Sequence, residues 1–219
     1  NYREDSAAAM GVVENIREAG GRAIALRADV RDAEQVRKMF DEIEESFRSA
    51  VTDLVNSAGI TGLCSTLLEA HPDTIRNVID TNVTGTILCC REAVKRMTIG
   101  CKGKKGGTIV NLSSGAATLG SPGEFVWYAA SKGAVDSFTM GLAKEVARQS
   151  IRVNAVAPGL TETDMPRAMG RPNRCEEMKD LIPIGRAAPP EEVAEPVLWL
   201  MSDNASYVTG AVLRVAGGR

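Results

Sequence analysis

Two kinds of hydrophobic pattern alternate along the 219-residue chain, and their order restricts its fold more than any other feature. Short apolar runs typical of buried strands lie at 22–28, 52–56, 108–113, 151–157 and 211–216. Apolar residues recur with helical spacing at 5–19, 32–48, 72–98, 126–149 and 190–202. Strands that alternate with helices favour a parallel sheet covered by helices, so the sequence predicts an α/β fold.

Local signals mark the ends of several predicted helices. Asp32 and Asp73 are suitable N-caps, and Gly20-Gly21 follows the first helical pattern, where glycine commonly ends a helix. Pro196 falls inside the last helical pattern and removes a backbone hydrogen-bond donor. We therefore expect a kink or a late start in the helix at 190–202.

Three side chains suited to carbonyl reduction fall at a workable spacing. Tyr128 and Lys132 are four residues apart, so on a helix they share a face, and the ammonium is expected to lower the pKa of the phenol. Ser114 stands at the end of a predicted buried strand. The end of that strand and the start of the following helix would meet at one proton-transferring site.

Five short motifs occur in the order found in the short-chain dehydrogenase/reductase family, which the sequence resembles along essentially its whole length. They are Asn56-Ser57-Ala58-Gly59, Asn82-Val83-Thr84-Gly85, Ser114, Tyr128-x-x-x-Lys132 and Pro158-Gly159-x-Thr161. The resemblance implies a Rossmann-type doubly wound sheet that binds NAD or NADP. The segments 119–124 and 207–218 are most similar to glucose 1-dehydrogenase-like members, and 3-oxoacyl-carrier-protein reductases are close alternatives.

This resemblance implies a role for each candidate catalytic residue. Tyr128 would be the acid in carbonyl reduction and the base in alcohol oxidation, so its pKa must fall from the ordinary value of about 10. Lys132 would lower that pKa and bind the nicotinamide ribose, while Ser114 would hold the substrate oxygen. Asn82 would help to hold a water that relays protons to Lys132, with an interhelical hydrogen bond as the alternative. Ser113 points to the other side of the strand and is expected to be structural.

Cofactor-binding residues are implied at the carboxyl ends of the strands. They are Asp29 and Val30 at the adenine, Asn56, Ala58 and Gly59 along the next strand end, Pro158, Gly159, Thr161 and Thr163 near the carboxamide and diphosphate, and Tyr128 and Lys132 at the nicotinamide. Arg3 suits a 2'-phosphate by its charge and fork geometry, so we expect NADP in preference to NAD. A solvated arginine is the alternative for that position.

The chain begins directly with a helical pattern, whereas a Rossmann-type unit begins with a strand and a glycine-rich turn. With the strand order of the family, two interior strands would be missing and the run at 22–28 would have no neighbour connecting it to 52–56. Unpaired backbone at a buried edge is costly. We therefore expect residues 1–219 to form one dinucleotide-binding domain that is incomplete at its N-terminus.

Three classes of function compete for such a chain. The leading hypothesis is an NADP-dependent oxidoreductase that interconverts an alcohol and a carbonyl, on a sugar such as glucose or on a small ketone. A truncated, non-catalytic family member is the rival, and a nucleotide-sensing regulator is the third. A regulator has no need of Tyr128 and Lys132, so their intact spacing favours the enzyme.

Composition limits the partners and the compartment. A formal net charge of −2 gives no electrostatic case for nucleic acid or an anionic membrane, and the basic cluster at 102–105 precedes two glycines, which predicts a turn. Five cysteines without a C-x-x-C pair and one histidine, His71, show no metal-binding spacing. These features, and the absence of a signal-like or membrane-length apolar segment, predict a cytoplasmic protein without a metal.

Residues 160–186 lack a clean period and are rich in Pro, Gly, Met and Arg, so we expect a mobile substrate lid there. Its basic residues Arg167, Arg171, Arg174 and Lys179 are offset by four acidic residues, so charge alone does not select a substrate. The helical patterns at 81–101 and 126–149 carry apolar residues on more than one face, and the family usually pairs these helices between subunits. We expect a homotetramer.

Overall fold

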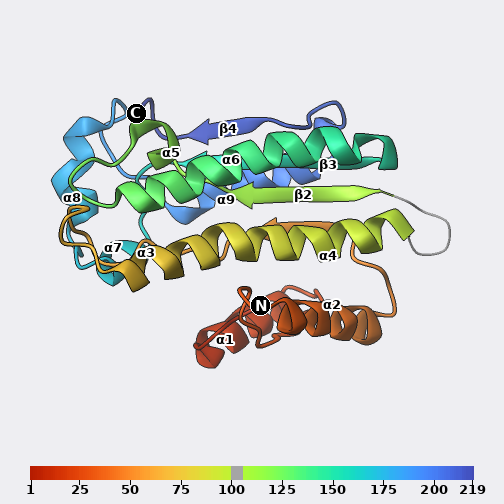
Figure 1. Ribbon diagram of the computed structural model, residues 1–219. Helices are drawn as coiled ribbons and strands as arrows, with labels where there is room; N and C mark the ends of the chain where they lie inside the picture. Colours follow the sequence, from red (N-terminus) through yellow and green to blue (C-terminus); the bar gives the residue numbers. More distant parts are fainter. Residues whose placement is uncertain (100–105) are drawn as a thin grey trace.

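The computed structural model describes residues 1–99 and 106–219, and its centre is a sheet of four parallel strands in the order β1-β2-β3-β4 (Figure 1). The strands are β1 (Asp53–Asn56), β2 (Gly107–Leu112), β3 (Ile151–Pro158) and β4 (Val212–Val215). Each one lies within two residues of an apolar run predicted as a strand. The predicted α/β fold with a parallel sheet is therefore confirmed.

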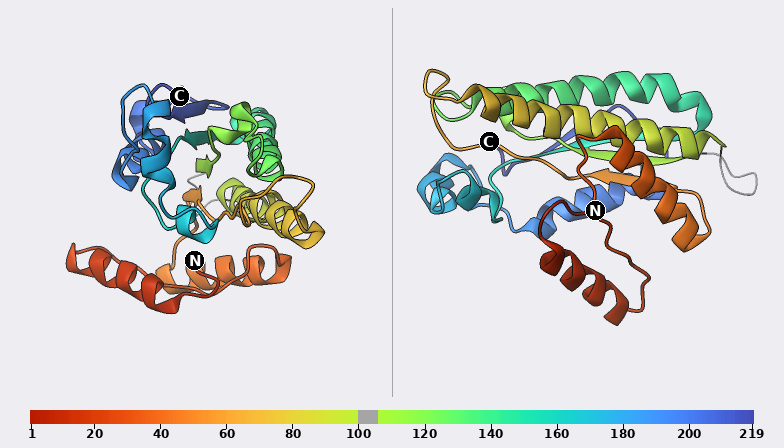
Figure 2. Two further views of the ribbon diagram at one scale, coloured as in Figure 1. Left: turned by 90° about the vertical axis from the view of Figure 1, so that its left-hand side faces the viewer. Right: turned by 60° about the horizontal axis from the view of Figure 1, so that its bottom comes forward.

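Helices cover both faces of this sheet, as Figure 2 shows on its left. The helices are α1 (Ser6–Glu18), α2 (Ala33–Phe47), α3 (Pro72–Ile79), α4 (Gly85–Ile99), α5 (Ala116–Leu119), α6 (Val126–Val146), α7 (Met165–Ala168), α8 (Arg174–Met178) and α9 (Pro190–Met201). On one face, Ile109 and Val153 pack in the core shared with α4 and α6. On the other, Val110 and Val156 pack with residues of α9. Neighbouring strand residues thus point to opposite, equally buried faces.

The run at 22–28 forms no strand, so that prediction is wrong. It makes a single bridge between Tyr2 and Arg27, with hydrogen bonds of 3.0 Å from Tyr2 N to Leu26 O and from Ala28 N to Tyr2 O. A strand needs a neighbour with which to form a ladder, and no described strand lies beside this run. As expected, it does not pair with β1. This segment, α1 and α2 lie on one side of the molecule, below α4 in Figure 1.

The predicted helix ends are confirmed at two places. Asp32 caps α2 by accepting hydrogen bonds from Glu34 N and Gln35 N. Gly20 follows the end of α1 with a φ of +83°, a conformation that favours glycine.

Asp73 is not an N-cap, contrary to the prediction. His71 caps α3 instead, because its Nδ1 accepts a hydrogen bond of 3.2 Å from Asp73 N. Pro72 occupies the first helical position, where its missing N–H costs nothing. The helix therefore begins one residue before Asp73.

For the last helix, one of the two expected alternatives, a late start, is excluded. Helix α9 begins at Pro190 and continues through Pro196 to Met201. Pro196 lacks the N–H that would bond to the carbonyl of Glu192, but Glu192 is exposed, so water can satisfy that oxygen. Of the two alternatives predicted from the sequence, only a kink is compatible with this helix.

Other sequence predictions concern features outside the sheet. The basic cluster at 102–105 lies outside the described residues. In the part of the chain that the structure describes, no helix is both long and apolar enough to span a membrane. The four described cysteines are free thiols.

Candidate active site

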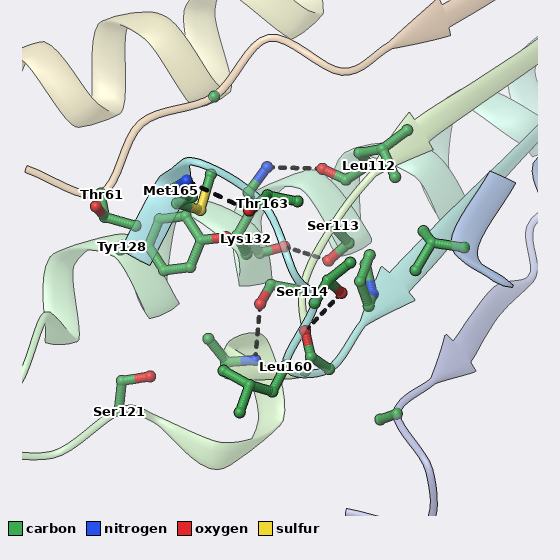
Figure 3. Close-up of a pocket in the computed structure, with 18 of the residues that line it drawn as sticks. Thr61, Leu112, Ser113, Ser114, Ser121, Tyr128, Lys132, Leu160, Thr163 and Met165 are labelled. Carbon is green, nitrogen blue, oxygen red and sulfur yellow. Dashed lines mark hydrogen bonds between the residues drawn. The ribbon is translucent and has the colours of Figure 1, made fainter. Parts of the chain in front are cut away.

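A cavity of about 1000 Å³ opens at the carboxyl ends of the strands. Ser114 follows β2, Gly159 follows β3, and Tyr128 and Lys132 reach the cavity from α6. Figure 3 shows Ser114, Tyr128 and Lys132 around the same space. The structure thus brings together three of the four predicted catalytic residues as lining residues of one cavity.

Tyr128 lies in the first turn of α6, with its ring almost completely buried. Phe125 packs against it edge to face, with ring centroids 5.5 Å apart and an interplanar angle of 88°. Ser114 lies where the chain leaves β2, and its Oγ accepts a hydrogen bond of 3.1 Å from Ala116 N. Both side chains are therefore held in place by local contacts.

The pKa of Tyr128 departs from the sequence-based expectation. Burial raises this pKa above its ordinary value, and the hydroxyl of Ser114 only partly opposes that effect. The Lys132 ammonium is 5.8 Å from the centroid of the Tyr128 ring. These side chains alone do not lower the pKa of the phenol. Lowering it to the neutral range would take further positive charge beside Tyr128.

Lys132 is buried, and its Nζ donates a hydrogen bond of 2.6 Å to the carbonyl of Leu112 (Figure 3). Burial lowers the pKa of Lys132 to about 8, while the carboxylate of Asp136 opposes this shift. A lysine with such a pKa exchanges its proton close to neutral pH. Ser113 Oγ donates to the carbonyl of Lys132 at 3.4 Å, but Ser113 also lines the cavity, so the expectation that it lies away from the site is wrong.

Asn82 lies behind the cavity in a π-helical turn, η1 (Asp80–Thr84), between α3 and α4. Its side chain is fully buried and exchanges two hydrogen bonds of 2.8 Å with the main chain of Ile60. Its Nδ2 also donates to Ser131 Oγ at 3.0 Å, which is the interhelical hydrogen bond considered from the sequence. Asn82 therefore fixes the loop after β1 against α6, directly beside Lys132. π-Helical turns of this kind are frequent at functional sites.

Five of the predicted cofactor-binding residues line the cavity in addition to Tyr128 and Lys132. They are Gly59, Pro158, Gly159, Thr161 and Thr163. An added Cβ at Gly59 would lie 3.4 Å from both Lys132 Nζ and Asn82 Oδ1. Glycine thus leaves this part of the cavity open in front of the lysine. The Lys132 ammonium is a hydrogen-bond donor, and Gly59 leaves space in front of it. These residues fit the ribose hydroxyls of a nicotinamide nucleotide.

The other five predicted cofactor-binding residues do not line the cavity. They are Arg3, Asp29, Val30, Asn56 and Ala58. Asn56 Nδ2 donates to Asn111 Oδ1 at 2.9 Å, so this amide joins β1 to β2. Val30 packs against the start of α4, where an added Cβ at Gly85 would come within 2.7 Å of its Cγ2.

The two charged members of this group have partners on the surface. Arg31 holds the carboxylate of Asp29 with its Nε at 2.9 Å, and this contact lowers the pKa of Asp29. Arg3 pairs with Glu4 at 2.7 Å, and its side chain is 44% exposed. Arg3 is therefore accessible to a ligand from solvent, whereas the carboxylate of Asp29 is already hydrogen-bonded.

Sequence reasoning missed one pair of residues that lines the cavity. Glu124 and Arg174 form an ion pair in which both guanidinium terminal nitrogens bond the two carboxylate oxygens. The guanidinium of Arg174 lowers the pKa of Glu124. Fifty residues separate the partners, so no local pattern signals this contact.

Comparisons with known proteins agree with this geometry. A family model described as enoyl-(acyl carrier protein) reductase matches residues 2–219. The chain is 49% identical to the uncharacterized oxidoreductase YgfF of Escherichia coli (strain K12), over all of this chain and 88% of that relative. It is 39% identical to a 3-oxoacyl-[acyl-carrier-protein] reductase of Synechocystis sp., over all of this chain and 84% of that relative.

Solved structures show the same similarity. The structure of a short chain dehydrogenase from Burkholderia cenocepacia J2315 in complex with NADP matches with a TM-score of 0.88 and 30% identity. The match covers 99% of this chain and 84% of that chain.

Proposed function

The chain belongs to the short-chain dehydrogenase/reductase family of oxidoreductases, and from that premise we propose that it interconverts an alcohol and a carbonyl with a nicotinamide nucleotide, NADP in preference to NAD. One observation carries the proposal: Ser114, Tyr128 and Lys132 line a single cavity at the carboxyl ends of the strands. Such a cavity is the usual ligand-binding position in sheets of this type.

In carbonyl reduction, the residues around the cavity have separate roles. Ser114 holds the substrate oxygen with its hydroxyl, and Tyr128 gives its phenolic proton to that oxygen as negative charge develops on it. When bound in this cavity, a nicotinamide would supply or accept the hydride, and its oxidised ring would add positive charge near the phenol. Alcohol oxidation uses the same groups in reverse, with Tyr128 as the base.

Lys132 serves Tyr128 in two ways. Its pKa of about 8 allows it to hold or release a proton near neutral pH. Together with the positive charge of an oxidised nicotinamide, its ammonium would favour the ionised phenol. Asn82 keeps Ser131, and with it this part of α6, in position. The proton-relay water suggested for Asn82 belongs to the same proposal.

The preference for NADP rests on Arg3. Its side chain is 44% exposed, and its positive charge is close enough to Asp29 to help lower the pKa of that carboxyl. A guanidinium suits the 2'-phosphate, which distinguishes NADP from NAD. The similar enzyme from B. cenocepacia, whose structure contains NADP, supports this choice.

The lining of the cavity favours a ketone with an apolar body. Apolar side chains dominate the wall beyond Ser114, and they include Leu119, Phe125, Leu160, Met165, Met169 and Met178. A sugar would leave many hydroxyls without partners against such a wall. We therefore favour the 3-oxoacyl type of substrate, for which the similar Synechocystis enzyme is named, over the sugar expected from the sequence.

We also infer that the protein is a cytoplasmic homotetramer. Ile87 on α4 and Met140 on α6 are 38% and 43% exposed, which is consistent with a second copy covering these helices. Analytical ultracentrifugation tests the number of subunits directly.

Turnover with defined substrates tests the proposed function. The protein is incubated with NADPH or NADH and, separately, with a 3-oxoacyl thioester, a cyclic ketone and a steroid ketone, and with glucose plus NADP⁺ or NAD⁺. Alcohol formed in proportion to the NADPH consumed supports the proposal. Failure to convert any of these compounds, although the nucleotide binds, would favour a non-catalytic family member.

A further inference from the structure

A partly buried ion pair joins the segment 160–186 to the residues just before Tyr128. Arg174 is the first residue of α8, and Glu124 stands four residues before Tyr128. The side chains of Arg174 and Glu124 are only 8% and 23% exposed, and Arg174 Nη2 lies 2.7 Å from Glu124 Oε2. A bidentate pair removed from solvent has a well-defined geometry, unlike a surface pair.

Arg174 differs from the other basic residues of this segment. Arg171 pairs with Glu177 at 2.6 Å and Lys179 pairs with Glu176, and all four side chains are at least 41% exposed. These pairs join residues within the segment itself. Arg186 pairs with Glu192 outside the segment at 2.6 Å, but Glu192 does not line the cavity. Among the described residues of 160–186, Arg174 is therefore the basic residue whose ion pair reaches another part of the cavity wall.

A line of aromatic contacts continues from this ion pair to Tyr128. The Arg174 guanidinium carbon lies 5.3 Å from the centroid of the Phe125 ring. Phe125 is 4% exposed and makes the edge-to-face contact with Tyr128 at 5.5 Å. Cation–π and edge-to-face contacts both depend on ring orientation, so they transmit the position of Arg174 to Tyr128.

We propose that Arg174 is a positioning residue with two roles: through Glu124 it holds the segment 160–186 closed over the cavity, and through Phe125 it fixes the orientation of Tyr128. The second role rests on the function proposed above. Each role has its own signature, because closure affects substrate binding and the orientation of Tyr128 affects the chemical step.

Removing one partner should open the segment rather than leave a charge buried. Without Arg174, the carboxylate of Glu124 would be partly buried and unpaired, which is costly. Two main-chain hydrogen bonds also join the loop after β1 to this region, from Ser65 N to Glu124 O at 2.8 Å and from Cys64 N to Met169 O at 3.0 Å. These bonds remain in the variant, so the sheet and the loop after β1 stay folded, while the residues around position 174 lose their ion pair and loosen.

The test compares Arg174→Gln with the charge-exchanged variant Glu124→Arg/Arg174→Glu, and uses Arg171→Gln as the matched control from the same segment. Hydrogen–deuterium exchange of residues 160–186 reports closure. A spectroscopic titration of tyrosinate, with Tyr128→Phe as the reference, reports the environment of Tyr128. Neither readout requires enzyme activity, and steady-state kinetics with a ketone and NADPH are measured in parallel.

For Arg174→Gln we expect exchange in 160–186 to increase at least tenfold, a higher KM, and a kcat lowered roughly tenfold. The pKa of Tyr128 should fall toward its ordinary value of about 10 as the ring becomes more exposed. In the charge-exchanged variant the ion pair re-forms, so the exchange rate of 160–186 and the KM should return to their wild-type values. Its kcat stays low, because residue 174 no longer places a cation over Phe125.

The proposal would be overturned if Arg174→Gln and Arg171→Gln had the same exchange rate in 160–186 and the same pKa of Tyr128. Fast exchange that persists in the charge-exchanged variant would contradict the closure role, and full recovery of kcat there would contradict the role through Phe125. If the wild-type protein reduces no ketone, the proposed function fails, but exchange and titration still decide whether Arg174 holds the segment and Tyr128.

Discussion

The side chain of Asn82 and the main chain of Ile60 are joined by a reciprocal pair of hydrogen bonds. Ile60 N donates to Asn82 Oδ1 at 2.8 Å, and Asn82 Nδ2 donates to Ile60 O at 2.8 Å. The same Nδ2 bonds Ser131 Oγ at 3.0 Å, one residue before Lys132. A single buried amide therefore holds the loop after β1, the π-helical turn and α6 together.

Asn82→Ala should destabilise the protein by about 3 kcal/mol, because it removes three hydrogen bonds and leaves the main-chain groups of Ile60 without their partner. Denaturant unfolding measures this change. Ser131→Ala is the control, since it removes only one of these three bonds, together with the 2.7 Å bond from Ser131 Oγ to the carbonyl of Tyr128, and should cost about 2 kcal/mol. Equal destabilisation by the two substitutions would show that the Asn82–Ile60 pair contributes little.

Lys132→Met should change how stability depends on pH. Below pH 8, the folded wild-type protein holds a charged, buried Lys132, which reduces its stability. Between pH 8 and 10.5, the folded lysine has lost its proton but the unfolded chain still binds one, so stability rises with pH. Over this window the wild type should gain up to about 3 kcal/mol relative to the variant.

Thermal melts from pH 6 to 10.5 test this linkage. Lys144→Met is the control, because Lys144 lies on the same helix and is exposed. The stability difference between Lys144→Met and the wild type should stay nearly constant. A constant difference for Lys132→Met as well would contradict a lowered pKa for Lys132.

Arg3→Ala should weaken the binding of NADPH tenfold or more and leave the binding of NADH unchanged, because a charge-assisted contact with the 2'-phosphate is worth about 1.5–3 kcal/mol. Isothermal titration calorimetry measures both affinities. Glu4→Gln frees Arg3 from its ion partner and should not weaken the binding of NADPH. Equal losses for both nucleotides would refute the role of Arg3.

Hydrophobic pattern predicted the sheet because its strands are buried on both faces. Ile109 and Val110 are both fully buried although they point to opposite faces, and such strands appear in the sequence as continuous apolar runs. The run at 22–28 also contains apolar residues, but no strand among the described residues lies beside it to form a ladder. The sequence indicated that this run would not be connected to 52–56, but its apolar pattern alone still predicted a strand there.

Other features depend on contacts that local patterns do not contain. The helical pattern at 72–98 continues through the π-helical turn at 80–84, so the sequence pattern did not predict that turn. The spacing of Tyr128 and Lys132 predicted their proximity correctly. It could not reveal that the Tyr128 ring is buried, which raises the pKa of the phenol. The ion pair of Arg174 with Glu124 joins residues fifty positions apart.

The rate of ketone reduction by NADPH in wild-type protein and in Tyr128→Phe tests the central claim most directly. If Tyr128 donates the proton, kcat should fall by roughly 10²–10⁴-fold, while the affinity for NADPH and the melting temperature stay close to those of the wild type. A Tyr128→Phe variant that reduces the ketone as fast as the wild type would contradict the assignment of this cavity as the active site.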